Sequence, residues 1–302
     1  MLQSEDSALT SGVTGCDEVR AQCVGKLGYN LTRCEPNVSR VNIPEIHDQP
    51  WLPPSIRDGI TDTLQCIFRI GGVYRPIVPR LSNALEATDT VRLVDLCSGS
   101  GGPWAWLDAK LARRDCAPLN IQLTDKFPNT AARERGELRP HGGVAYCAES
   151  VDATSVPDHL DGFRTMFASF HHFEPHEAAA IIQSAVNRRE GIGIFEPPSR
   201  RAFSILLTFT FPLLAALVVP FIRPFRWSRL FWTYLVPVIP FVLWFDGVLS
   251  CLRAYSPEEL STMVATLHQN DYIWEVGVTR GWLVPVTYVV GYPEPSSAEA
   301  NV

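Results

Sequence analysis

The chain has 302 residues, enough for one large α/β domain with insertions or for two smaller domains. Hydrophobic residues make up 46% of it and charged residues only 19%, below the roughly 25% charged residues of an average soluble domain. This composition indicates some apolar surface meant for lipid or for an apolar ligand. The net charge of −6 argues against a general nucleic-acid binder, which presents a basic face.

The N-terminal part shows no strand pattern. Its first residues lack the basic and apolar regions of a secretory signal, so we expect no export signal. Cys16, Cys23 and Cys34 do not have the spacing of a C-x-x-C zinc site, and we expect free thiols. Residues 1–85 are predicted to form a helical cap, with one helix over 55–70 that begins after two prolines and ends at two glycines.

From residue 91 onward, predicted strands and helices alternate, which is typical of a mostly parallel sheet with helices on both faces. Five strands are expected over 91–96, 120–124, 143–147, 164–169 and 191–195. Helices are expected over 104–114, 175–188 and 257–268. A turn near Gly281 joins two further strands, over 273–278 and 284–290, as an antiparallel pair. The expected fold is a Rossmann-like α/β domain with a seven-stranded sheet.

An apolar insert interrupts this alternation after the fifth strand. Residues 202–222 and 230–245 contain no charged residue, and three arginines lie between them. The first segment, of about 21 residues, is long enough to cross a bilayer as one helix, whereas the second is shorter and holds two prolines. The sequence therefore predicts an apolar helical hairpin.

Three interpretations of this insert remain open. A hairpin embedded in one face of a membrane is favoured, because a full two-span anchor would place the arginines outside, against the positive-inside tendency. The third interpretation is a soluble lid or a face for a second copy of the chain. In the membrane interpretations, the α/β domain lies on the cytoplasmic side and is attached through residues 199–251. All three place an apolar wall beside the carboxyl ends of the strands, which predicts an apolar or lipid-like ligand.

A glycine-rich turn over 95–102, Asp-Leu-Cys-Ser-Gly-Ser-Gly-Gly, follows the first predicted strand. Glycines let the backbone approach a ligand closely, and the turn presents N–H groups at the start of a helix. Asp125 and Asp152 follow the second and third strands, where a ribose and an adenine would be bound. An NAD(P) fingerprint would require a third glycine at the position of Trp104.

On these residues, the sequence resembles the class I S-adenosylmethionine (SAM)-dependent methyltransferases over about 91–292, less the insert. Residues 94–101 are similar to that family's first motif, and the segments Phe-His-His-Phe (170–173), Ile-Phe-Glu-Pro (194–197) and 252–260 resemble its later motifs. The resemblance implies SAM as the cofactor. It implies that SAM is bound by Asp95, Cys97, Ser98, Gly99, Ser100, Gly101, Asp125, Lys126, Asp152, Ala153 and Phe170.

Candidate catalytic residues follow the fourth and fifth strands. His171 and His172 are expected beside the transferred methyl group, where an imidazole can take a proton near neutral pH or, alternatively, shape the pocket through hydrogen bonds. Glu196 is expected to orient the acceptor or, alternatively, to cap a loop. His47 and Asp48 are expected to reach the site from the cap. A base is not obligatory, because methyl transfer gains most from alignment, and no metal is predicted.

The sequence thus predicts a class I SAM-dependent methyltransferase that acts at an O, N or C atom of an apolar small molecule. One alternative is a membrane-associated methyltransferase of a lipid or quinone, and another is a membrane-anchored SAM- or nucleotide-binding protein without turnover. The predicted organisation comprises a cap (1–85), a SAM-binding domain (86–198 and 252–295), the insert (199–251) and a tail (296–302).

Overall fold

The computed structural model describes residues 39–111, 118–129, 132–134, 143–267, 271–281 and 284–294. The predictions for the first part of the cap, with Cys16, Cys23 and Cys34, and for the tail lie outside the described residues. Four cysteines among the described residues, Cys66, Cys97, Cys147 and Cys251, are free thiols.

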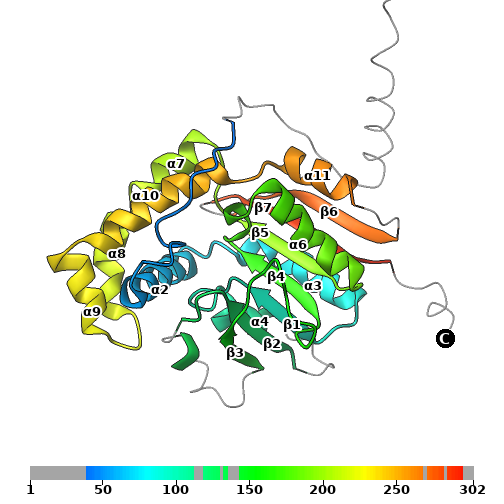
Figure 1. Ribbon diagram of the computed structural model, residues 1–302, viewed down its shortest axis with the longest axis horizontal. Coiled ribbons are helices and arrows are strands. Elements are labelled where there is room, and N and C mark those ends of the chain that lie inside the picture. The colour runs from blue at the N-terminus through cyan, green and yellow to red at the C-terminus, as the bar shows by residue number, and fades with distance from the viewer. Residues whose placement is uncertain are drawn as a thin grey trace, which may run out of the picture. The chain divides into compact units, whose positions relative to one another are not determined.

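A seven-stranded sheet carries the fold. Its strands are β1 (Arg92–Leu96), β2 (Asn120–Asp125), β3 (Val144–Ser150), β4 (Phe163–Phe167), β5 (Ile192–Glu196), β6 (Tyr272–Thr279) and β7 (Val286–Pro293). They lie in the order β3-β2-β1-β4-β5-β7-β6 (Figure 1). The first five strands pair in parallel, whereas β7 pairs antiparallel with both β5 and β6. The predicted Rossmann-like, mostly parallel sheet and its antiparallel last pair are confirmed.

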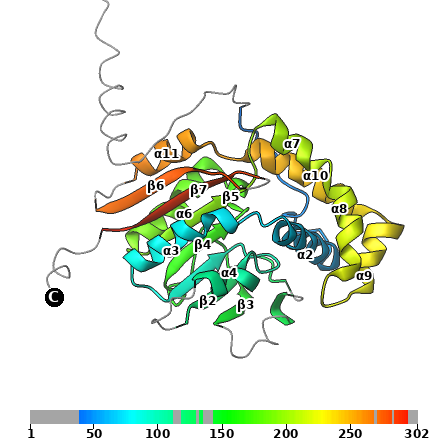
Figure 2. The same cartoon turned by 180° about the vertical axis from the view of Figure 1, so that it is seen from behind.

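Helices cover both faces of the sheet, as predicted. One face carries α3 (Val78–Ala87) and α4 (Trp104–Leu111), and the other carries α6 (Pro175–Asn187) and α11 (Pro257–Ala265) (Figures 1 and 2). Every residue of β4 and β5 is buried between these layers, including the polar side chains of Arg164, Thr165 and Glu196. Both α6 and α11 begin with a capping box, in which a side chain and the backbone at the helix start exchange hydrogen bonds.

The second half of the cap and the insert pack together as a helical layer. Helix α2 (Pro54–Ile70) confirms the predicted cap helix and contacts α8 (Phe211–Val218), α9 (Trp227–Leu230) and α10 (Val238–Arg253) of the insert. The shared core consists of Leu52, Ile56, Ile60, Ala215, Ile239, Val242 and Leu243. Segments that are far apart in the sequence therefore form one apolar layer (Figure 1).

The insert is more broken than the sequence predicts. Residues 202–222 form α7 (Ala202–Thr208), α8 and the short η3 (Val219–Phe221), and the chain bends by 41° between α7 and α8. The expectation of one continuous helix is therefore wrong. The reason is Pro212 in the first turn of α8, because a proline lacks the N–H that would continue a helix and clashes with the preceding turn.

The second apolar segment is broken as well. It comprises α9, the π-helical turn η4 (Phe231–Leu235) and α10, with a bend of 75° before α10. Within the described residues, no single helix has the length and apolar character needed to cross a bilayer, whereas the two bent pairs meet that test only as pairs. The remaining short helices are η1 (Arg75–Ile77) and η2 (Phe170–His172).

Candidate active site

A cavity of about 590 Å³ opens where the parallel strands end and the helical layer begins. One end is lined by Cys97, Ser98, Gly99, Ser100, Gly102, Asp125, Lys126, Asp152 and Ala153. The other end is lined by Glu45, His47, Asp48, His171 and His172. Leu64, Leu207, Phe211, Leu214 and Leu243 of α2 and the insert form apolar walls. Most of the predicted cofactor residues thus share one cavity with the predicted histidines.

The glycine-rich turn bends sharply under the cavity. Gly99, Gly101 and Gly102 have φ angles of 50°, 98° and 51°, in the left-handed region that glycine adopts without a steric penalty. Cys97 also has a positive φ, of 55°, although it carries a Cβ atom. The Ser98 N–H donates to the carbonyl of Thr124, at the end of β2. The turn is therefore fixed to the neighbouring strand.

Asp95, at the end of β1, stabilises this turn through hydrogen bonds. Its carboxylate accepts hydrogen bonds from the hydroxyls of Ser98 and Thr165, each at 2.6 Å, and only 1% of the residue is exposed. Burial raises the pKa of Asp95 to about 6, although the two hydroxyls act to lower it. Asp95 does not line the cavity, and neither do Gly101, the fully buried Phe170 or Glu196. These four predicted residues lie behind the cavity wall.

The acids after β2 and β3 do line the cavity. Asp125 accepts backbone N–H groups of Gly99 at 2.7 Å and Phe127 at 2.8 Å, and burial raises its pKa. Lys126 Nζ donates to Asp152 at 2.8 Å; partial burial acts to raise the pKa of Asp152, but this bond and those from Thr154 bring it to about 2. Anionic Asp152 and the carboxylate of Asp125 fit the hydroxyl and amino donors of an adenosyl group.

An N-terminal strap, residues 39–50, reaches the other end of the cavity. Three arginines hold it there by donating to backbone carbonyls. The bonds run from Arg40 to Arg253 (2.7 Å) and Phe173 (2.8 Å), from Arg57 to Gln49 (2.6 Å), and from Arg253 to Ile43 (2.9 Å) and His172 (2.5 Å). The strap is thereby fixed against the loop after β4. This places His47 and Asp48 beside the cavity, as predicted.

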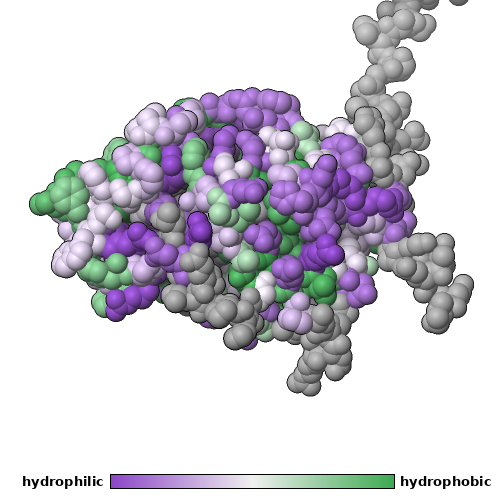
Figure 3. Space-filling model, turned by 60° about the horizontal axis from the view of Figure 1, so that its bottom comes forward, coloured by the Kyte–Doolittle hydropathy of each residue, from purple (hydrophilic) through white to green (hydrophobic). Residues whose placement is uncertain are grey.

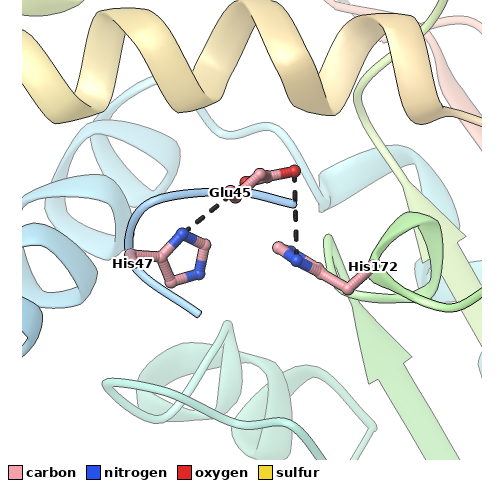
Figure 4. A group of neighbouring side chains, drawn as sticks. All are labelled: Glu45, His47 and His172. Atoms are coloured by element: carbon pink, nitrogen blue, oxygen red, sulfur yellow. Dashed lines mark ion pairs between the residues drawn. The ribbon is translucent and has the colours of Figure 1, made fainter. Parts of the chain in front are cut away.

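A buried carboxylate lies among the three histidines. Glu45 is 1% exposed, and its oxygens lie 3.6 Å from His47 Nδ1, 3.9 Å from His172 Nδ1 and 3.5 Å from His171 Nε2. Figure 4 shows Glu45 of the strap between His47 and His172. Glu45 was not among the predicted site residues, although the sequence shows this acidic residue two positions before the candidate His47.

Each imidazole also faces a second carboxylate through Nδ1. The pairs are His47 with Asp246 at 3.2 Å, His171 with Glu196 at 2.5 Å, and His172 with Asp48 at 2.7 Å. Asp246 comes from α10 and also accepts the backbone N–H groups of Ile46 and His47. The sequence analysis did not identify Asp246, because nothing local connects the insert with the strap.

These neighbours shift the protonation of the cluster. Burial opposes the charged form of His47, yet the surrounding carboxylates raise its pKa to about 10. Burial likewise opposes charged His171, but Glu196 and Glu45 raise its pKa to about 9. Burial acts to raise the pKa of Glu45, and the histidines lower it to about 2. The free protein therefore holds paired charges at this end of the cavity.

Glu196 occupies a supporting position. One oxygen accepts the N–H groups of Ser169 at 2.8 Å and Phe170 at 2.9 Å, and the other contacts His171. It fixes the loop that carries the two histidines. Of the three predicted catalytic residues, only His171 and His172 line the cavity, and His172 is the more exposed.

Comparisons with known proteins give structures but no sequence family. No protein-family model and no curated protein matches the chain. An O-methyltransferase family protein from Burkholderia thailandensis is 15% identical, with a TM-score of 0.41, over 74% of this chain and 57% of that one. Human N-acetylserotonin methyltransferase in complex with SAM is 12% identical, with a TM-score of 0.42, over 76% and 55%.

A third solved structure is an O-methyltransferase from neocarzinostatin biosynthesis with S-adenosyl-L-homocysteine (SAH) and 1,4-dihydroxy-2-naphthoic acid. It is 12% identical, with a TM-score of 0.46, over 78% of this chain and 58% of that one. The chain therefore spans a little over half the length of these three proteins. The order and directions of its strands show a Rossmann-like α/β fold, and its ligands have to be inferred from its own residues.

Proposed function

We propose that the protein is a SAM-dependent methyltransferase that acts on an apolar small molecule carrying an ionisable O–H or N–H group. The observation that supports this most is the single cavity. It joins the glycine-rich turn and two strand-end acids to a cluster of histidines and carboxylates, between apolar walls. A cofactor at one end and an acceptor at the other would thus meet inside one apolar enclosure.

Different residues that line the cavity would bind the cofactor and the acceptor. When bound, SAM supplies a methyl group activated by a sulfonium sulfur. The turn, Asp125 and Asp152 bind the adenosyl part, while Leu207, Phe211 and Leu243 hold the acceptor and exclude water. The side chains around His172 contact the polar atom of the acceptor and accept the proton that this atom loses.

Binding of SAM and of its demethylated product SAH, measured by calorimetry, tests the cofactor assignment. Asp125→Ala and Asp152→Ala each remove a charged acceptor of hydrogen bonds, so we expect each to weaken binding by about tenfold. Asp161→Ala is the matched control, because Asp161 is exposed and pairs with Arg92 at the opposite end of β1. Unchanged affinity in both variants would contradict the assignment.

Turnover separates the enzyme from a protein that only binds SAM. The full chain is incubated with SAM and a panel of phenols, amines, quinols and fatty acids, and SAH formation is followed. We expect SAH formation with at least one apolar phenol or quinol, whose hydroxyl can lose its proton to the side chains around His172. Tight SAM binding without turnover on any acceptor would favour the non-catalytic alternative.

We further propose that the insert rests on a lipid surface, from which an apolar acceptor enters. The exposed large apolar residues of α7–α10 form an extended surface that comprises Phe203, Leu206, Phe209, Leu213, Leu217, Phe221, Phe225, Trp227, Phe231, Tyr234, Leu235, Val236 and Phe241. Figure 3 shows apolar residues at the end of the molecule that carries α8 and α9. Exposed Arg223 lies among these aromatics, a combination that suits an anionic interface.

A further inference from the structure

We propose that Glu45, His47 and His172 bind one divalent transition-metal ion at the acceptor end of the cavity. One potential ligand atom of each residue lies within 4.8 Å of the others. Ligands that are about 2.0–2.2 Å from a Zn²⁺ ion lie about 3–4 Å from one another, so a small inward movement of the side chains suffices. Figure 4 shows the three side chains converging from the strap and from η2.

The donor set suits such an ion. Two imidazoles and one carboxylate bind zinc and non-haem iron at sites that keep a coordination position open for another ligand. Glu45, His47 and His172 all line the cavity, so an open position would face an acceptor. The glycine-turn residues and the strand-end acids line the same cavity, but none of them is among the three proposed ligands, so the two sets of binding residues do not overlap.

A second observation points to the same place. His171 is 2% exposed, and its Nε2 atom has no hydrogen-bond partner within the described part of the chain. That atom faces Glu45 Oε1 at 3.5 Å, so a buried polar atom is directed at the proposed site without a satisfied partner. An unsatisfied buried nitrogen is unfavourable, and an ion with its bound water would offer it a partner.

The carboxylates around Glu45 also favour a cation, and metal binding would displace the proton that they hold on His47. Within the described ranges, neither arginine nor lysine forms an ion pair with Glu45, and Asp48 and Asp246 add two further carboxylates. The nearby guanidinium groups of Arg57 and Arg253 donate to backbone carbonyls instead.

Asp48 and Asp246 provide the outer layer of the site. They contact Nδ1 of His172 and His47, respectively, at 2.7 and 3.2 Å. An imidazole that binds the ion through Nε2 would keep this Nδ1 contact, and such a carboxylate orients the ring and increases its basicity. Ser250 Oγ donates to both oxygens of Glu45 at 3.0 Å, which orients the third ligand.

The role of this ion rests on the proposed function, and the ion would specify the class of acceptor further. A cation beside the acceptor would bind an acceptor oxygen and lower the pKa of its hydroxyl group. The acceptor class then narrows to molecules with an oxygen donor at the polar end, and a neighbouring second oxygen would strengthen binding by chelation.

Metal analysis of the full chain tests the site. The protein is stripped with chelator, loaded with Zn²⁺, desalted and analysed for metal; Zn²⁺ affinity is measured by calorimetry, with Mg²⁺ as a comparison. We expect about one Zn²⁺ per chain and tighter binding of Zn²⁺ than of Mg²⁺. Co²⁺ loading of the same protein should give the visible absorption of a nitrogen- and oxygen-ligated ion. A chain that retains no Zn²⁺ and gives no Co²⁺ absorption would overturn the proposal.

Variants locate the ion and separate this proposal from the proposed function. Glu45→Gln and His47→Asn should each weaken Zn²⁺ binding by at least about tenfold. His176→Asn should not, because His176 is exposed and is not among the residues that line the cavity. SAH affinity should stay within about twofold in all three variants, which also shows that they fold. Wild-type Zn²⁺ affinity in Glu45→Gln would overturn the site, whereas absent SAH binding in every protein would refute only the methyltransferase.

Discussion

At the scale of single residues, burial decides whether an aspartate at the end of a strand can contact a ligand in the cavity. Asp125 and Asp152 face the cavity, whereas Asp95, in the equivalent place after β1, is covered by the glycine-rich turn. Its two hydroxyl partners are side chains of the turn and of β4. Asp95 therefore stabilises the shape of the turn, and its burial makes that stabilisation depend on pH.

The contribution of Asp95 to the stability of the folded protein should fall as pH rises from about 4 to about 6. Because the pKa of Asp95 is raised from 3.8 to about 6, the folded chain keeps a proton that the unfolded chain has lost. The stabilisation by protonated Asp95 is thus present at about pH 4 and disappears above about pH 6. At about 1.4 kcal/mol per pKa unit, the effect is about 3 kcal/mol.

Urea unfolding across this pH range checks the prediction. In Asp95→Asn this pH-dependent contribution is absent, so the variant should gain about 3 kcal/mol relative to the wild type between about pH 4 and pH 7. Asp161→Asn, at an exposed acid, should follow the wild type. A constant difference between Asp95→Asn and the wild type would show that Asp95 does not titrate in this window.

At the scale of elements, one buried ion pair links the cap, the turn and the insert. Arg229 of α9 donates to Asp62 of α2, and both side chains are almost fully buried. The other oxygen of Asp62 accepts the hydroxyl of Ser100, in the glycine-rich turn, at 2.5 Å. The insert is thereby connected to the cofactor end of the cavity through two side chains.

Breaking this pair should destabilise the fold and loosen the turn. Arg229→Met leaves a buried carboxylate without its cation, which costs about 3–5 kcal/mol of unfolding free energy. Adding Asp62→Asn should recover part of that loss, because the uncompensated charge is then gone. Arg226→Met, at an exposed pair with Glu134, should cost less than about 1 kcal/mol. Additive losses in the double variant would show that the two residues are not coupled.

At the scale of the whole molecule, the apolar face of the insert is too extensive to be explained by scattered surface residues. It spans α7 to α10 and carries the aromatic side chains Trp227 and Phe221 among its most exposed members. Since α8 and α10 contribute their other sides to the core shared with α2, these helices carry apolar side chains on both the buried and the exposed sides. This arrangement suits a helical layer that lies on a membrane surface.

Vesicle co-sedimentation of the full chain tests this arrangement. Replacing both Phe221 and Trp227 with serine should lower binding to anionic phospholipid vesicles by about tenfold, because two large apolar contacts are lost. Ile70→Ser is the control, since Ile70 is exposed but lies outside the insert. If the wild-type chain does not bind the vesicles and sediments as a dimer, this face is the interface with a second copy of the chain instead.

The alternation of strands and helices, the glycine-rich turn and the order of the acids at the ends of β1, β2 and β3 could all be predicted from the sequence. These features depend on periodicity and on near neighbours, which local preferences control. His171 and His172 were accessible for the same reason, because they directly follow a recognisable buried strand.

Only the tertiary structure decided which side chains meet. Asp48 contacts His172 across 124 positions, and Asp246 contacts His47 across 199, so no local pattern relates them. Likewise, only packing turns Asp95 inward and leaves one side of the broken insert exposed. Buried charged groups need hydrogen-bond or ion-pair partners, and apolar groups need apolar neighbours. Which groups come close enough to serve depends on the packing of the whole chain.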